Sequence, residues 1–132
     1  MNKDLFDRGM KTRREVLGDA YVDASLAQAS EFSMEMQELV TQYCWGDVWN
    51  RPGLERASRS LINLSMLSAL NRSHELATHV RGAVRNGVTR DEIKEVFLQT
   101  AIYCGVPAGI ESFRVANAVF AQMDAEAAEQ EG

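Results

Sequence analysis

The 132-residue sequence is poor in features that mark several common protein classes. Its two cysteines, Cys44 and Cys104, do not form a Cys-x-x-Cys pair, so neither a redox dithiol nor a thiolate metal site is expected, and both are interpreted as buried thiols. No apolar run is long enough to span a bilayer, and the charged N-terminal stretch lacks the apolar core of a secretion signal. These absences predict a cytoplasmic protein that does not insert into membranes.

Excess positive charge is also lacking. The chain has 14 Lys and Arg against 19 Asp and Glu, a formal net charge of −5, whereas nucleic-acid binding usually needs a clustered positive face. Part of the negative charge lies in residues 124–132, which are expected to form a fraying acidic helix end. With 45% apolar and 25% charged residues, the chain is predicted to be one globular domain over residues 1–132.

Strand patterns are absent, and the sequence has two prolines. Because β-branched and aromatic residues never alternate with polar ones over a strand's length, the chain is predicted to be all-α. Gly18 and Asn71 are expected to end helices, Thr89 and Glu92 have the spacing of a capping box, and Pro107 is expected to stop a helix. The expected helices cover residues 3–17, 33–44, 54–70, 72–87, 90–104 and 108–126, with a loop or short turn at 45–53. Helix 54–70 is expected to be central and contacted on several sides.

One expected helix, residues 72–87, carries the most informative polar residues. At spacings of three and four, Arg72, Glu75 and His79 share one side of this helix, where an acid, an imidazole and a fixed cation can meet. The other histidine, His74, faces elsewhere and is expected to be exposed. This stripe is the candidate site for chemistry; the alternative is an ion pair beside a structural histidine.

Four motifs in a fixed order resemble those of the carboxymuconolactone decarboxylase family over roughly residues 31–120. They are Trp45-Gly-Asp-Val-Trp-x-Arg-Pro-Gly-Leu54, Glu75-Leu-x-x-His79, Gly87-x-Thr89-x-x-Glu92-Ile93 and Ala101-Ile-Tyr-Cys-Gly-Val-Pro-Ala108. The resemblance implies an orthogonal helical bundle of the alkylhydroperoxidase D-like type, with about six to seven helices, assembled as a homo-oligomer, either trimer or hexamer. An apolar side on the last expected helix also favours self-association.

The resemblance implies cofactor-independent decarboxylation of 4-carboxymuconolactone to the enol-lactone of 3-oxoadipate, a step of bacterial protocatechuate breakdown. Neither a metal nor an organic cofactor is implied, because the substrate's own ring accepts the electron pair as a dienolate. The protein must hold two carboxylates, stabilise charge on the lactone oxygen and deliver a proton to ring carbon. Peroxidase activity is disfavoured, because Arg72 and Glu75 stand where the redox branch of the fold has its two cysteines.

Within this family, His79 is the candidate proton donor, since imidazole titrates nearest to neutral pH. Glu75, one turn earlier, is expected to orient the ring and favour its protonated form. Arg51 and Arg59 are the favoured carboxylate ligands, with Arg72 as a further candidate, because the arginine fork bonds both carboxylate oxygens. Alternatively, Arg59 extends to the surface and Arg51 caps a turn.

Aromatic residues are further candidates for substrate binding. Trp45 and Trp49 are interpreted either as walls around a flat lactone or as packing residues, and Tyr103 as a hydrogen-bond donor to the lactone oxygen or as packing. Residues 109–114 depart from the pattern expected of the pathway enzyme. A paralogue acting on another carboxylated lactone or keto acid therefore stays an alternative, as does a non-catalytic helical oligomer or small-ligand binder.

Overall fold

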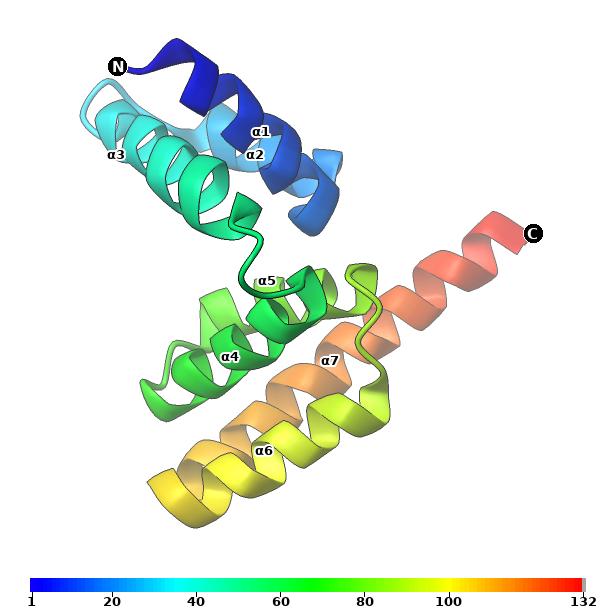
Figure 1. Cartoon of the computed structure of the whole chain (residues 1–132). Helices are drawn as coiled ribbons and strands as arrows, with labels where there is room; N and C mark the ends of the chain where they lie inside the picture. Colours follow the sequence, from blue (N-terminus) through cyan, green and yellow to red (C-terminus); the bar gives the residue numbers. More distant parts are fainter. Residues whose placement is uncertain (132) are drawn as a thin grey trace. The chain divides into compact units, whose positions relative to one another are not determined.

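The computed structural model describes residues 1–131, and every regular element within them is helical (Figure 1). The all-α class and the estimate of about six to seven helices are confirmed. The chain forms two compact units, residues 1–56 and the segment from Ala57 onward. None of the described helices is both long enough and apolar enough to cross a membrane.

The first unit contains three α-helices, followed by one segment wound more widely than an α-helix and one wound more tightly. Its elements are α1 (Lys3–Leu17), α2 (Asp19–Gln28), α3 (Met34–Leu39), the π-helix η1 (Val40–Asp47) and the 3₁₀-helix η2 (Val48–Asn50). As predicted, α1 ends at Gly18, whose φ of 90° suits a residue without a Cβ. The sequence did not predict α2, because only Val22 is buried in this helix and it therefore has no apolar stripe.

The expected loop over residues 45–53 is wrong for residues 45–50, because the helical run that starts at Met34 continues through η1 and η2 to Asn50. Gly46 looked like a break in the sequence, but its role is close packing. A Cβ on Gly46 would lie 2.4 Å from the Leu5 carbonyl oxygen of α1, and one on Gly9 would lie 1.8 Å from the Thr41 carbonyl oxygen of η1. The two glycines thus let α1 and the π-helix touch backbone to backbone.

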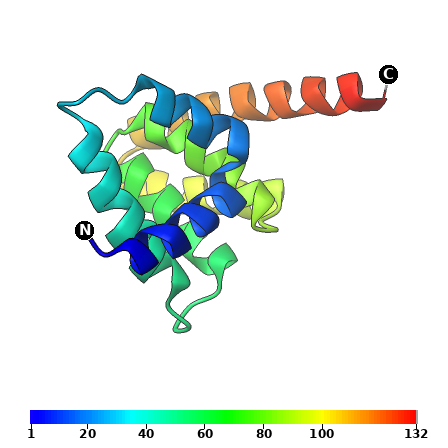
Figure 2. The same cartoon turned by 90° about the horizontal axis from the view of Figure 1, so that it is seen from above.

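The second unit has four α-helices over its described residues. They are α4 (Arg56–Ala69), whose first residue is the last of the first unit, α5 (Ser73–Arg85), α6 (Arg90–Cys104) and α7 (Val106–Glu131). Figure 1 shows α6 and α7 side by side, and the C-terminal part of α7 extends beyond the start of α6, as the view from above in Figure 2 also shows for the end of α7.

Most boundaries in the second unit lie where the sequence predicts them. Asn71, with φ of 58°, follows α4, and Thr89 forms the predicted capping box with Glu92 at the start of α6. As predicted, α6 ends just before Gly105, which has φ of 113°. Pro107 is not what stops it: this proline lies in the first turn of α7, where its missing amide costs no helical hydrogen bond. The acidic end stays helical to Glu131, and residue 132 lies outside the described residues.

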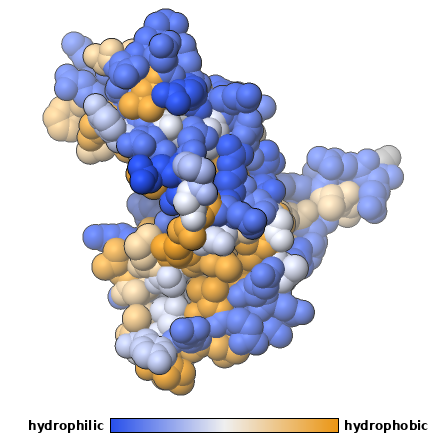
Figure 3. All heavy atoms as spheres, viewed as in Figure 1, coloured by the Kyte–Doolittle hydropathy of each residue, from blue (hydrophilic) through white to orange (hydrophobic). Residues whose placement is uncertain are grey.

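The core of the second unit lies between α4, α5, α6 and α7. Phe97 is fully buried and meets Phe113 edge to face, with ring centroids 5.9 Å apart. The expectation that α4 is contacted on several sides is wrong, because only Ser60, Leu64 and Ser68 of this helix are buried. Figure 3 shows the consequence, apolar atoms gathered on the surface of the second unit.

Candidate functional site

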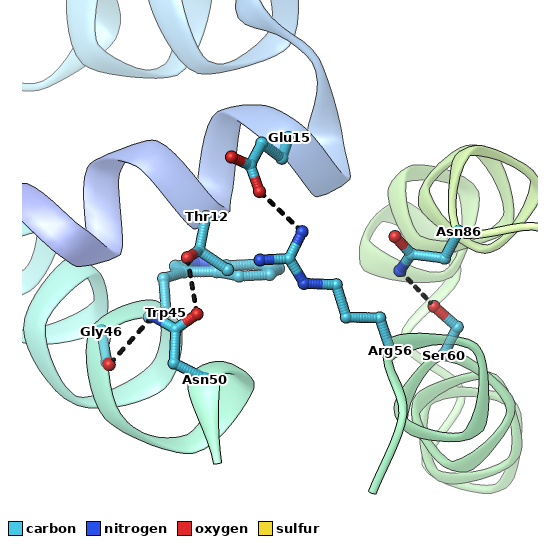
Figure 4. Close-up of polar contacts among 8 residues, drawn as sticks. All are labelled: Thr12, Glu15, Trp45, Gly46, Asn50, Arg56, Ser60 and Asn86. Atoms are coloured by element: carbon cyan, nitrogen blue, oxygen red, sulfur yellow. Dashed lines mark hydrogen bonds and ion pairs between the residues drawn. The ribbon is translucent and has the colours of Figure 1, made fainter. Parts of the chain in front are cut away.

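Two polar contacts join α4 to α5 in the second unit. The side-chain nitrogen of Asn63 on α4 lies 3.4 Å from Nδ1 of His79 on α5. Nearer the N-terminal end of α4, the Ser60 hydroxyl accepts a hydrogen bond of 2.9 Å from the side-chain amide of Asn86, the C-cap residue of α5 (Figure 4). These four residues, which we call the α4–α5 polar seam, run along two antiparallel helices. The sequence stripe on α5 therefore has a polar counterpart on α4.

The His79 ring is partly buried, and burial lowers its pKa below the ordinary value near 6.5. The carboxylate of Glu75 raises the pKa, as the sequence led us to expect, but it is the smaller of the two effects. The imidazole of the free protein is therefore neutral at neutral pH. In a neutral ring one nitrogen donates and the other accepts, so its hydrogen-bond partner decides which nitrogen carries the proton.

The other two members of the predicted stripe are more accessible. Glu75 and Arg72 are exposed, and Arg72 is not in the helix: it is the N-cap residue of α5, with φ of −97° and ψ of 71°. The expectation that one helix presents all three side chains is therefore wrong for Arg72. Glu75 and His79 keep the one-turn relationship that the sequence predicted.

Arg59 lies on α4 one turn before Asn63, so the two side chains share a side of that helix. Arg59 is partly buried and its Nε atom is fully enclosed. This burial disfavours the alternative in which the guanidinium simply extends into solvent. Carboxylate binding by Arg59 remains a prediction that its place beside the α4–α5 polar seam supports.

The remaining predicted arginine and both tryptophans belong to the first unit. Trp45 and Trp49 are only 3% and 5% exposed, and their rings stack with centroids 5.0 Å apart, among the buried residues of this unit. This burial favours the packing interpretation of the two tryptophans. Arg51 is exposed at the end of η2, where its backbone amide donates to the Val48 carbonyl.

A network around Asn50 holds the tryptophan segment against α1 (Figure 4). The Asn50 amide donates to the carbonyls of Trp45 and Gly46, both at 3.1 Å, and its oxygen accepts from the Thr12 hydroxyl at 2.9 Å. Asn50 thus binds carbonyls that the end of the π-helix leaves open. Beside it, the first unit has a cleft of about 280 Å³ lined by cationic side chains, of which Arg56 pairs with Glu15 at 2.7 Å.

Tyr103 lies apart from the histidine. It is 81% exposed at the edge of an apolar groove of about 460 Å³ between α4 and α6, which neither His79 nor Asn63 lines. Cys104 lines the same groove and is exposed, so the expectation of a buried thiol is wrong for this cysteine. The groove does not bring Tyr103 and His79 together.

The divergent segment, residues 109–114, takes part in packing. Ser112 is buried and its hydroxyl meets that of Ser68 on α4, while the carboxylate of Glu111 accepts a hydrogen bond from Ser73 at the start of α5. Gly109 lies so close to α6 that a Cβ would be 2.6 Å from the Cβ of Ala101. The residues that differ from the expected pattern therefore help to join α7 to α4, α5 and α6.

Sequence reasoning missed the α4 half of the polar seam. Ser60 and Asn63 were not singled out, although with Arg59 they place polar side chains three and four positions apart on a helix that is otherwise rich in leucine, isoleucine and methionine. That spacing was the available signal. Their partners on α5 could not be read from the sequence, because pairing depends on how the two helices cross.

Comparisons with known proteins agree with the helical fold and with the family that the sequence motifs indicate. The model of the carboxymuconolactone decarboxylase family matches residues 34–118, and the chain belongs to this family. It is 46% identical to nitrosuccinic acid decarboxylase of Metarhizium robertsii over 87% of this chain and 80% of that one. It is also 40% identical to 4-carboxymuconolactone decarboxylase of Acinetobacter baylyi over 90% of this chain and 89% of that one.

The two relatives extend the family assignment to an enzyme class. Both are decarboxylases, that is, carbon–carbon lyases that remove carboxyl groups. The expected lyase class is therefore confirmed for the chain as a decarboxylase of this family. Their names differ in the compound that is decarboxylated.

Proposed function

We propose that the chain decarboxylates 4-carboxymuconolactone to the enol-lactone of 3-oxoadipate without a cofactor, as a cytoplasmic step of protocatechuate breakdown, with His79 as the proton donor. The observation that carries the proposal is the setting of His79: a neutral, partly buried imidazole whose Nδ1 faces Asn63 and which lies one turn from Glu75. Arg59, one turn from Asn63, is the first candidate for holding a substrate carboxylate, with Arg51 and Arg72 as further candidates.

The proposed reaction needs one proton per turnover. When the bond to the departing carboxylate breaks, its electron pair moves through the ring double bond to the lactone oxygen, and carbon dioxide leaves. A proton must then form a new C–H bond on the ring. Because a bound dianion favours a nearby cation, substrate binding raises the pKa of His79, and the ring becomes an imidazolium that can then deliver a proton.

A second candidate substrate is nitrosuccinic acid, favoured by the 46% identity to a decarboxylase of that compound. In this case the nitro group accepts the electron pair as a nitronate. Both compounds contain a succinate unit in which the carbon that loses its carboxylate is joined to the electron acceptor. A site that holds two carboxylates at this spacing and delivers a proton to substrate carbon suits either compound.

The test is carbon dioxide release from each compound, with protein dialysed against a metal chelator. Wild type should turn over at least one of them, and His79→Gln should lose roughly 10²–10⁴-fold in kcat, the usual contribution of a general acid. His74→Gln is the matched control, because His74 lies on the same helix and is exposed. No release from either compound would refute the proposed activity, and a fully active His79→Gln enzyme would remove His79 from the mechanism.

We also propose that the chain forms a homo-oligomer, a trimer or a hexamer. Support comes from the apolar side chains on either side of Gly105, where α6 ends and α7 begins. Ile102 is 80% exposed there, and Val106 and Ile110 are also exposed. Large apolar side chains gathered in this way usually bind a partner. Sedimentation should give three or six chains for wild type and a smaller species for Ile102→Glu; a monomeric wild type at micromolar concentration would contradict the proposal.

A further inference from the structure

The Nδ1 atom of His79 faces a neutral amide. The Asn63 side-chain nitrogen lies 3.4 Å from it across the α4–α5 polar seam. Along the two helices, Glu75 acts on the ring through its charge, and Arg59 lies one turn from Asn63. The contact that orients the ring is therefore separate from the carboxylate that influences its charge.

An amide can partner both charge states of an imidazole. Its NH₂ group donates to the bare Nδ1 of a neutral ring that carries its proton on Nε2. After a half turn about its last side-chain bond, the amide oxygen accepts from the Nδ1–H of an imidazolium. A carboxylate in the same place could accept from an Nδ1–H but could not donate to a bare Nδ1, so it would favour the opposite neutral tautomer and the charged ring.

We propose that Asn63 is a positioning residue for His79, whose amide stays on Nδ1 in both charge states of the ring and so leaves Nε2 as the nitrogen that transfers the proton. During turnover the N–H bond at Nε2 breaks, and a C–H bond forms at the substrate carbon that takes the proton, which for the lactone is the ring carbon next to the carbonyl. The ring returns to neutral. The catalytic part of this role rests on the proposed function of His79, whereas the orientation of the ring does not.

The second contact of the seam offers a matched control. Asn86 makes the same kind of contact between α4 and α5, to Ser60, without touching His79. Replacing either asparagine by alanine removes one partly buried amide from the seam. A change at His79 that follows Asn63→Ala but not Asn86→Ala therefore comes from the contact with the ring and not from loosening of the helix pair.

Nitrogen-15 NMR of the histidine rings tests the orientation without substrate. The chain has two histidines, and exposed His74 serves as an internal reference in every sample. Wild-type His79 should show one dominant tautomer, and Asn63→Ala should shift it toward the mixture seen for His74. Asn63→Asp should raise the pKa of His79 by about one unit or more. A tautomer and pKa of His79 that are the same in wild type, Asn63→Ala and Asn63→Asp would overturn the proposal.

Kinetic measurements separate the positioning role of Asn63 from the proposed decarboxylase activity. With a substrate that wild type decarboxylates, Asn63→Ala should lower kcat about tenfold or more, within the roughly 10²–10⁴-fold contribution of the whole general acid, and change KM little. It should also shift the pH profile of kcat, which Asn86→Ala should not do. An Asn63→Ala enzyme with wild-type kcat and pH profile would refute positioning in catalysis. If His79→Gln is fully active, the proposed role of His79 as proton donor fails while the decarboxylase activity stands, and the NMR result still decides the orientation of the ring.

Discussion

Close packing of α1 on the π-helix makes Gly9 the most sensitive backbone position in the first unit. A Cβ at Gly9 would lie 1.8 Å from the Thr41 carbonyl oxygen and 2.8 Å from the Gly46 amide nitrogen, whereas ordinary contact begins at 3.4 Å. Gly9→Ala must therefore move one backbone against the other by up to 3.4 − 1.8 = 1.6 Å. Because both obstructing atoms belong to the backbone, no side-chain rotation relieves the clash.

The expected cost follows from two opposing contributions. Overpacking of a well-packed site costs about 1–3 kcal/mol, and a backbone clash lies at the upper end. Alanine gains about 1 kcal/mol over glycine inside a helix. We therefore expect Gly9→Ala to lower the free energy of unfolding by about 2 kcal/mol.

Urea unfolding followed by tryptophan fluorescence measures this loss, because both tryptophans of the chain lie in the first unit. Gly53→Ala is the control: nothing lies within 4 Å of the position that its Cβ would take, so its free energy of unfolding should change by less than about 0.5 kcal/mol. If Gly9→Ala unfolds at the same urea concentration as Gly53→Ala, the backbone contact between α1 and the π-helix is not as close as described.

Two further predictions concern the second unit. Thr89→Ala removes the hydroxyl that accepts from the Glu92 amide and should lower the free energy of unfolding by about 1 kcal/mol; an unchanged urea midpoint by circular dichroism would contradict a working capping box. The second prediction is a pH effect. Since burial lowers the pKa of His79, the unfolded chain binds this proton more readily, and the associated stability is present above about pH 6.5 and is lost as pH falls through the folded pKa. Wild type should therefore lose stability more steeply than His79→Gln as pH falls below about 6.5, and parallel curves would show that burial of the ring has no such effect.

Local sequence was sufficient for the ends of most helices. Gly18, Asn71 and the Thr89 capping box act through backbone conformation and contacts within three residues, so the sequence carries the whole signal. Gly46 shows where the same reasoning fails. The sequence suggested a turn at Gly46, but this residue lies inside a π-helix. A side chain is excluded there because the Leu5 carbonyl of another helix lies too close.

The candidate site divides in the same way. The one-turn spacing of Glu75 and His79 is a property of a single helix, and the motifs around them were enough to indicate the family that the comparisons confirm. The preference for Trp45 and Trp49 as packing residues came only from the structure, because burial depends on what covers a side chain. Asn63 was missed for the same reason.

By itself the sequence determined the all-helical class, the family and the helix that carries the histidine, because helix formation and capping depend on near neighbours. Only the tertiary structure decided that His79 is partly buried and neutral and that its Nδ1 faces Asn63. Burial and partner choice both arise from the crossing of α4 and α5, which brings together residues 16 positions apart. The lowered pKa of the ring and the partner that its Nδ1 meets are consequences of that crossing.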